Sequence, residues 1–229
     1  MIEYLAWDSN FFDMRIGKSI ITTSSDWKSL ILELQDDSLY DLLYIYDETR
    51  GVSPLDVAKL VDIKVLYGNK IKYNDRIESN CILQFTGDNP DEDLYSLALI
   101  SGQCSRYKLD SRFPEGSYER LYSRWIENSV SGQIADAVLF YEENGHKIGM
   151  TTLSINGKNA SIGLIAVDEK VQGKGIGTKL ILASEQWLYD RGIDTLYVAT
   201  QKNNIQGCNF YHKMGFSCVA VTNIYHLWR

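Results

Sequence analysis

Three glycines, Gly173, Gly175 and Gly177, occupy alternate positions directly before a segment with helical periodicity. A glycine inside a helix lowers helix stability by roughly 1 kcal/mol relative to alanine, so three in one turn need a reason. The first NH groups of a helix lack intrahelical partners, and the helix dipole adds partial positive charge there. Because glycine has no Cβ, such a backbone can approach an anion closely. The spacing therefore favours a phosphate-binding loop over a merely tight strand-to-helix turn, for which one glycine would suffice.

Two widespread phosphate motifs do not fit this loop. Thr178 stands between the last glycine and Lys179, which breaks the GxxxxGK[ST] pattern of the P-loop. The dinucleotide fingerprint GxGxxG has a different spacing and opens a parallel βαβ unit, whereas an antiparallel meander is expected before this loop. The remaining pattern, [QR]-x-x-G-x-[GA], is met by residues 172–177.

A second segment, residues 204–216, places an asparagine seven residues before a tyrosine and closes with Gly-Phe. Together with the glycine loop and the strands expected between them, it resembles the GCN5-related N-acetyltransferases (GNAT). The resemblance covers about residues 93 to 229. It implies transfer of an acyl group to an amine, with acetyl-CoA or another short acyl-CoA as the co-substrate.

The same resemblance assigns the coenzyme to one strand, to the glycine loop and to the second motif. The strand before the loop should splay from its neighbour, so that its free backbone groups can pair with the pantetheine amides. The NH near Val167 should face the thioester carbonyl, and an NH aimed at a developing oxyanion is typically worth ~3 kcal/mol of barrier. The implied coenzyme-binding residues are Ile165, Ala166, Val167, Gln172, Gly173, Lys174, Gly175, Ile176, Gly177, Thr178, Asn204 and Tyr211.

Tyr211 is the implied general acid. Coenzyme A leaves as a thiolate with a pKa of about 8.5, by analogy with cysteine, whereas the pKa of tyrosine is about 10. A tyrosine is therefore protonated at pH 7 and can donate its proton as the thiolate leaves. The alternative is a core tyrosine on a buried helix face, because the chain has 15 tyrosines. Asn204 either contacts the coenzyme or caps its helix, a position that asparagine suits well.

Shorter segments resemble a narrower group, the dTDP-amino-dideoxyhexose N-acetyltransferases of the TDP-fucosamine type. This resemblance implies that the acceptor is the amine of a dTDP-linked amino-dideoxy sugar. Competing acceptors are a protein N-terminus, a polyamine or an antibiotic, and a non-catalytic CoA-binding module is the alternative to an enzyme. The segments are residues 7–12 (WDSNFF), 111–113 (SRF), 122–132 (YSRWIENSVSG), 198–201 (VATQ) and 225–229 (YHLWR).

Acceptor-side residues follow from that resemblance and from side-chain chemistry. Arg112 suits bidentate pairing with a nucleotide diphosphate, and a surface ion pair is its alternative. Aromatic side chains can stack on the thymine or the deoxysugar, although aromatics at this density are also typical of a core. No general base stands out, so Asp8, Glu127, His212 and a water relay all remain candidates. The candidate substrate-binding residues are Trp7, Phe11, Phe12, Arg112, Phe113, Trp125 and Gln201.

Two parts of the chain, which differ in their expected pattern of strands and helices, should position these residues in a mixed α/β fold. Residues 1–88 alternate short strands and helices and are predicted to form a smaller α/β domain on the substrate side, resembling a truncated GNAT half. Residues 89–229 are predicted to form the acyl-CoA-binding catalytic domain with a GNAT fold. The polar, acidic stretch at 86–93 marks the boundary between them.

Local signals place several elements. Residues 117–130 have the periodicity of an amphipathic helix, and residues 81–85 are expected to form a strand. Pro54 is expected in the first turn of a helix, where its missing NH costs nothing. Asn144-Gly145 and Asn156-Gly157 lie between apolar runs and predict two hairpins of an antiparallel meander. The chain is expected to end with two short strands, 216–220 and 223–227.

Bulk properties exclude several classes. The formal charge is −7 and there is no run of Lys and Arg, which argues against a nucleic-acid partner. No segment has the ~20 apolar residues of a membrane helix, and the first residues lack a basic n-region, so a cytoplasmic protein is expected. The four cysteines show no CxxC spacing, which favours reduced thiols and no metal site. Fold analogy suggests a homodimer.

Overall fold

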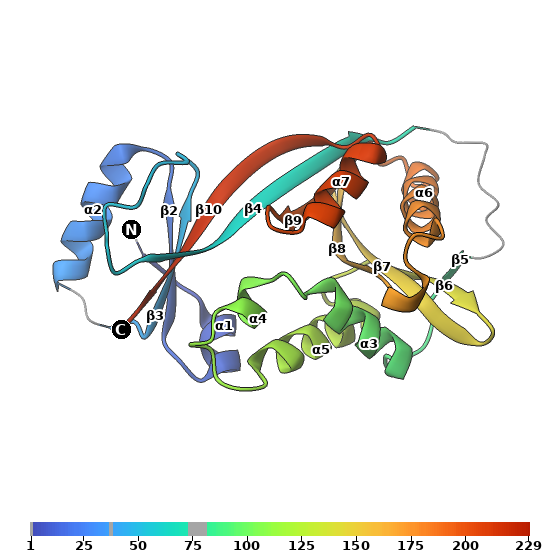
Figure 1. Ribbon diagram of the computed structural model, residues 1–229, viewed down its shortest axis with the longest axis horizontal. Helices are drawn as coiled ribbons and strands as arrows, with labels where there is room; N and C mark the ends of the chain where they lie inside the picture. Colours follow the sequence, from blue (N-terminus) through green and yellow to red (C-terminus); the bar gives the residue numbers. More distant parts are fainter. Residues whose placement is uncertain (1, 37–38, 73–81) are drawn as a thin grey trace.

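The computed structural model describes residues 2–36, 39–72 and 82–229. Figure 1 shows a mixed sheet that runs through both ends of the molecule, in the order β1-β2-β3-β10-β4-β9-β8-β7-β6-β5. The strands are β1 (Glu3–Tyr4), β2 (Ile16–Ile21), β3 (Leu42–Asp47), β4 (Lys59–Lys70), β5 (Ile82–Gln84), β6 (Ala137–Glu143), β7 (His146–Asn156), β8 (Asn159–Val167), β9 (Thr195–Gln201) and β10 (Ser217–Trp228). The helices are α1 (Ala6–Phe12), α2 (Ser24–Asp36), α3 (Glu92–Ser101), α4 (Arg106–Leu109), α5 (Ser117–Val130), α6 (Ile176–Tyr189) and α7 (Ile205–Lys213), with a 3₁₀ turn at Glu169–Val171.

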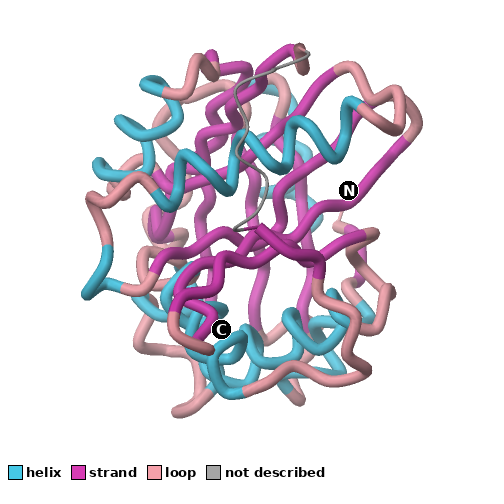
Figure 2. The backbone as a smooth tube through the Cα atoms, turned by 90° about the vertical axis from the view of Figure 1, so that its right-hand side faces the viewer, coloured by secondary structure: helices cyan, strands magenta, loops and turns pink. Residues whose placement is uncertain are grey.

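Helices cover both faces of this sheet (Figure 2). One core joins α1, α3, α4 and α5 to β2, β3 and β6–β8, and it runs from Phe12 and Tyr44 to Met150 and Leu164. A second core lies between α6, α7 and strands β4 and β6–β9, and a third packs α2 against β2, β3 and β10. Because α4 and α5 belong to the first core, they connect the first three strands to the remainder of the sheet.

The predicted meander is confirmed, and its two turns differ in detail. Asn144 and Gly145 both have positive φ, 54° and 78°, between the paired residues Glu143 and His146. This pair of left-handed residues is the type I′ geometry that matches strand twist. In the second hairpin only Gly157 has positive φ, because the two-residue loop is shifted by one position from the expected Asn-Gly pair.

The segment after Pro54 is not a helix. Residues 51–58 form bends and turns, in which Ala58 N donates to Leu55 O at 3.0 Å and Leu55 N donates to Ser53 Oγ at 3.1 Å. A serine side chain that binds the backbone two residues ahead favours a turn over a helix, so the prediction was wrong.

β10 ties the two ends of the sheet together. It pairs antiparallel with β3 through residues 223–228 and with β4 through residues 217–226. The prediction of two short strands was wrong, because the register shifts at Cys218/Ala220 and Ile224/Tyr225 absorb the irregularity within one strand of 12 residues.

The predicted boundary at residue 88 falls in the loop between β5 and α3. β4 lies inside the sheet between β10 and β9, whereas β5 lies at the far edge beside β6. The division into two domains, and the likeness of the first part to a truncated GNAT half, stay predictions. Cys81, predicted to start a strand, lies outside the described residues, whereas Cys104, Cys208 and Cys218 are free thiols. Within the described ranges no helix is long and apolar enough to cross a membrane, and no cluster of His, Cys, Asp and Glu is arranged to hold a metal ion.

Candidate active site

A notch opens where β8 and β9 separate. Their parallel ladder runs from Asn159↔Thr195 to Ile162↔Val198 and stops there, which confirms the predicted splay. Beyond that point β8 continues to pair with β7, and β9 continues to pair with β4. The edges of residues 163–167 and 199–201 that face each other therefore have no strand partner in the described part of the chain. Such edges can bind a ligand that carries amide groups.

A β-bulge causes the separation. The register of β7 and β8 shifts between Thr151 and Leu153, so that Gly163 and Leu164 both lie opposite Thr152. The Thr152 hydroxyl accepts the hydrogen bond from Leu164 N at 2.8 Å, and a Cβ on Gly163 would lie only 2.9 Å from that hydroxyl. A bulge bends its strand, and a glycine inside a strand often marks one.

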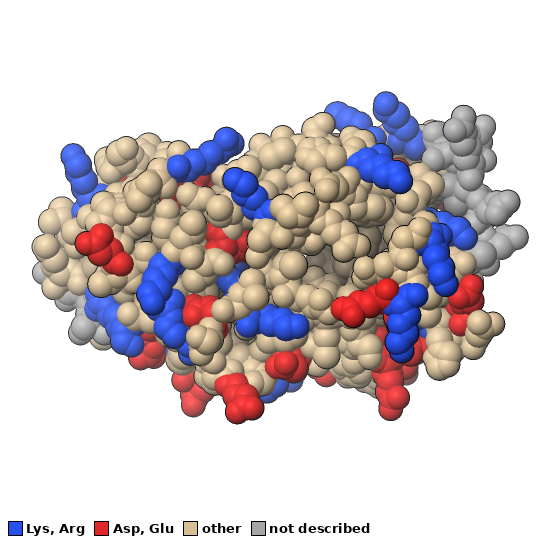
Figure 3. All heavy atoms as spheres, viewed as in Figure 1, with Lys and Arg blue, Asp and Glu red and all other residues tan. Residues whose placement is uncertain are grey.

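The notch leads into a cleft of about 170 Å³ between the sheet, α7 and α4–α5. Figure 3 shows a hollow on this face bordered mainly by uncharged residues, with charges of both signs scattered around it. Ile165, Asn204, Tyr211, Trp125 and Gln201 were predicted at the site and line the cleft together. Other lining residues were not predicted: Ser101, Ser105, Arg106, Tyr107, Tyr122, Ile162, Gly163, Leu164, Val198, Ala199 and Thr200.

Tyr211 lies on α7 with its ring in the core and its edge at the cleft. It is 5% exposed and packs against the rings of Tyr67, Phe210 and Phe216. Burial, with a smaller contribution from Cys208, raises the pKa of Tyr211 above its usual range. Its hydroxyl has no hydrogen-bond partner among the described residues, so its proton is available to a ligand in the cleft.

The three glycines of the loop are required for different structural reasons. Gly173 and Gly175 have φ of 80° and 82°, which L-residues with a Cβ rarely adopt, and a Cβ on either would meet no atom within 4 Å. At Gly177 a Cβ would lie 3.2 Å from the ring of Phe210, so this glycine allows α6 and α7 to pack closely. Gln172 fixes the loop by donating to Val167 O at 3.1 Å and accepting from Gln206 at 3.1 Å.

Replacing Gly175 by alanine is expected to weaken binding of the predicted acyl-CoA coenzyme. The substitution strains the N-cap of α6 by roughly 1–2 kcal/mol and shifts the first NH groups of the helix. We expect the KM for acetyl-CoA to rise about tenfold and the unfolding free energy to fall by about 1 kcal/mol. Gly132→Ala is the matched control, because Gly132 also has positive φ and free space for a Cβ but follows α5. An equal KM change in both variants would contradict a role of the loop in binding.

Asn204 caps α7. Its carboxamide oxygen accepts from Gly207 N at 3.0 Å, and its amide nitrogen donates to Thr200 Oγ1 at 3.0 Å. Since Asn204 also lines the cleft, capping and coenzyme contact are compatible. The remaining predicted coenzyme residues are Ala166 and Ile176, which are buried, Val167 and Thr178, which are half-buried, and Lys174, which is exposed in the loop.

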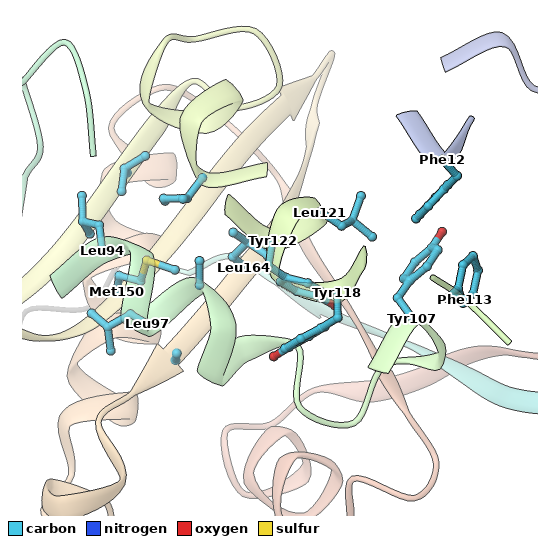
Figure 4. Close-up of a cluster of buried hydrophobic side chains, with 14 of the residues drawn as sticks. Phe12, Leu94, Leu97, Tyr107, Phe113, Tyr118, Leu121, Tyr122, Met150 and Leu164 are labelled. Carbon is cyan, nitrogen blue, oxygen red and sulfur yellow. The ribbon is translucent and has the colours of Figure 1, made fainter. Parts of the chain in front are cut away.

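Two of the predicted substrate aromatics are core residues. Phe12 and Phe113 are 4% and 7% exposed, and their ring centroids are 5.0 Å apart. Figure 4 shows Phe12 from α1 beside Tyr107 and Phe113. Trp7 and Phe11 behave differently: their rings stack at 5.0 Å, and Trp7 is 46% exposed.

Arg112 forms an ion pair within the protein, which was the alternative to its predicted role in binding a diphosphate. Its Nε and Nη2 donate to the two carboxylate oxygens of Asp110 at 3.0 and 3.2 Å. Asp110 also accepts from His226 Nδ1 and Trp228 Nε1, and these hydrogen bonds hold its pKa well below the usual range. The Nε–Nη2 edge of the Arg112 guanidinium is therefore already paired with a carboxylate.

Among the cleft-lining residues that sequence reasoning missed, Arg106 carries a charge. It belongs to Ser105-Arg106-Tyr107, which has the same Ser-Arg-aromatic pattern as residues 111–113. Its guanidinium lies over the rings of Tyr44 and Tyr107, 5.1 and 4.4 Å from their centroids. The repeated triplet was the available signal, and only the fold shows which arginine faces the cleft.

Two carboxylates act electrostatically on Arg106. Burial raises the pKa of Asp62 on β4 to about 6, and Arg106 opposes that shift only in part. Burial likewise raises the pKa of Asp8 on α1. The other base candidates point elsewhere: Glu127 accepts from Tyr95 and pairs with Arg124, and His212 contacts the Tyr67 hydroxyl.

Comparison with known proteins agrees with this geometry. Residues 103–216 match the model of the acetyltransferase (GNAT) family. The chain is 27% identical to a dTDP-fucosamine acetyltransferase of Escherichia coli O6:H1 over 93% of this chain and 92% of that protein. A GCN5-related N-acetyltransferase from Sphaerobacter thermophilus has a similar fold, with a TM-score of 0.63, 13% identity and coverage of 98% and 75%. A functionally unknown protein from Staphylococcus epidermidis also reaches a TM-score of 0.63, with 13% identity and coverage of 99% and 90%.

Proposed function

The chain belongs to the GNAT family of acyl-CoA-dependent N-acetyltransferases, and we propose that its acceptor is the amine of a dTDP-linked amino-dideoxy sugar. The observation that carries this proposal is the extent of one match. The similarity to the dTDP-fucosamine acetyltransferase spans 93% of this chain, and therefore extends over most of residues 1–88 as well as the part proposed to bind the coenzyme.

The donor side of the proposal rests on the notch and the glycine loop. The unpaired edge of residues 163–167 fits the two amides of a pantetheine arm, and the loop at 172–178 offers NH groups at the start of α6 to a pyrophosphate. We assign the thioester to the cleft between Ile165 and Tyr211, which both line it.

The acceptor side rests on the polar region between α1, α4 and β4. The charges of Asp62 and Asp8 interact there with that of Arg106 without direct contact. The stacked, partly exposed rings of Trp7 and Phe11 offer a flat surface for a pyrimidine base. Trp125 and Gln201 are the predicted acceptor residues that line the cleft itself.

The reaction follows from these positions. The neutral amine nitrogen attacks the thioester carbonyl carbon, the carbon–sulfur bond breaks, and the thiolate takes the proton of Tyr211 Oη. We assign the proton leaving the amine to Asp62, the carboxylate on β4 whose charge interacts with that of Arg106 in the cleft lining. Its pKa of about 6 leaves the carboxylate ionised at pH 7. Backbone NH groups of β8 at the notch stabilise the oxyanion between the two steps.

A panel of acceptors tests the proposal. Purified protein is incubated with acetyl-CoA and either dTDP-amino-dideoxyhexoses, the corresponding free amino sugars, a polyamine or a peptide, and release of free thiol is followed. We expect turnover with one or more nucleotide-linked sugars at a kcat/KM at least 100-fold above that of the other amines. Faster turnover of the polyamine or the peptide would overturn the sugar assignment and leave the acyl-transfer activity intact.

A further inference from the structure

Arg106 is a half-buried cation, and no counter-ion contacts it in the part of the chain that the structure describes. It forms no ion pair with a carboxylate in the ranges that the structure describes, and its Nε is buried without a hydrogen-bond partner. Nη2 donates to the hydroxyls of Tyr46 at 3.1 Å and Tyr107 at 2.7 Å. Burial of a guanidinium is costly unless it is paired, so this arrangement leaves one interaction unmade.

Arg112, in contrast to Arg106, has its guanidinium paired with a carboxylate. Its fork is closed by both oxygens of Asp110, whereas the carboxylates near Arg106 act on it only through longer-range attraction. The two Ser-Arg-aromatic triplets therefore differ in chemistry: Arg112 is satisfied within the protein, and Arg106 is not.

The surroundings of Arg106 are rich in hydrogen-bond donors. Because Tyr46 and Tyr107 accept from Arg106, their own hydroxyl protons point away from it and can be donated to another group. The hydroxyls of Tyr44 and Ser105 are also buried here, next to those of Tyr107 and Tyr122, and neither makes a hydrogen bond of good geometry within the described ranges. A guanidinium with several unused hydroxyl donors matches an oxyanion.

We propose that Arg106 binds an anionic oxygen of the acceptor, which on the acceptor proposed above is the diphosphate that joins the sugar to its nucleoside. Arg106 and Tyr211 line the same cleft, so an acceptor whose amine reaches Tyr211 presents its linking group to Arg106. The coenzyme does not compete for this role, because its pyrophosphate has the glycine loop and its pantetheine arm is uncharged.

The test uses the full chain saturated with coenzyme A, so that the glycine loop is occupied. Inorganic pyrophosphate and dTDP are titrated calorimetrically into the wild type, Arg106→Gln, Arg106→Lys and Arg120→Gln; Arg120 is an exposed arginine on α5 and serves as the matched control. We expect both anions to bind the wild type and the control, and Arg106→Gln to weaken them at least tenfold, with a smaller loss for Arg106→Lys. Absence of anion binding to the wild type would overturn the proposal without any variant.

Kinetics separate this site from the proposed function. With a dTDP-sugar that the wild-type enzyme acetylates, Arg106→Gln should raise the KM of the acceptor 10–50-fold. It should leave the KM of acetyl-CoA unchanged and change kcat less than threefold. Unchanged acceptor KM, or an equal loss with the free amino sugar, would overturn the role of Arg106 while the reaction stands. Arg106-dependent pyrophosphate binding with no turnover of any dTDP-sugar would instead overturn the acceptor assignment and support the anion site.

Discussion

Replacing Tyr211 by phenylalanine should lower kcat by about 100- to 1000-fold, with little change in the KM of acetyl-CoA. The reason is that a positioned acid typically contributes 10²–10⁴-fold, and the phenyl ring keeps the packing against Tyr67 and Phe216. The raised pKa of Tyr211 keeps the proton on the hydroxyl throughout the neutral range. Steady-state thiol release with the best acceptor of the panel measures the effect.

Stability separates this loss from misfolding. The Tyr211 hydroxyl has no partner among the described residues, so the phenylalanine variant should unfold at the same denaturant concentration or slightly above it. Tyr67→Phe is the matched control: its ring packs 5.7 Å from Tyr211, but its hydroxyl lies 3.3 Å from His212 Nε2 and not at the cleft. We expect that control to keep kcat within threefold. A Tyr211→Phe enzyme with near wild-type kcat would remove the tyrosine from the mechanism.

The second large effect is expected at Asp62. Asp62→Asn should lower kcat/KM for the acceptor by about 100-fold at pH 7.5, because the carboxylate that accepts the amine proton is lost. In the wild type, kcat/KM should rise with pH through about 6 and level off above it, since the base acts only when ionised. The variant should lack this acidic limb. Asp88→Asn, at an exposed position between β5 and α3, is the control. It should retain both the wild-type kcat/KM at pH 7.5 and the decrease of kcat/KM at acidic pH.

Stability should move in the opposite direction to activity. Burial raises the pKa of Asp62 from 3.8 to about 6, so the folded state holds that proton more tightly than the unfolded chain. The carboxyl group therefore contributes stability below pH 4, and this contribution is lost as the pH rises to 6 and above. At pH 7 Asp62→Asn should raise the unfolding free energy by about 1–3 kcal/mol, and the gain should vanish below pH 4. An asparagine variant that is less stable at pH 7 would indicate a structural role for the carboxylate.

Periodic and turn-rich segments were predictable from the sequence. Residues 117–130 form the predicted helix with the predicted limits, and the two Asn-Gly pairs do mark hairpins, because a left-handed turn depends on a few neighbouring residues. The short helices α1 and α4 were missed, since seven and four residues give no helical period to detect. Residues 7–12, which form most of α1, nevertheless carry one of the segments that resemble the amino-sugar N-acetyltransferases.

The proposed coenzyme side of the site is likewise easier to predict from the sequence than the proposed acceptor side. The splay of β8 could be predicted because a contiguous motif lies directly after the strand. Its cause could not be predicted, because the bulge at Gly163 depends on a contact with Thr152 that no local sequence pattern indicates. The acceptor side combines α1, β4 and α4, which are far apart in sequence. Asp62 sits in a strand with no motif of its own, and Arg106 could not be told from Arg112 until their partners were known.

The position of β10 in the sheet also has a consequence for how the protein folds during synthesis. β3 and β4 both lie next to β10, but more than 140 residues of chain separate them from it. A ribosome emits roughly 5–20 residues per second, so both strands wait many seconds with an open edge before residues 217–228 emerge. Unpaired edges of this kind are templates for wrong pairing. Chaperone protection in the nascent state, rather than the stability of the finished fold, is therefore expected to limit the yield of active protein.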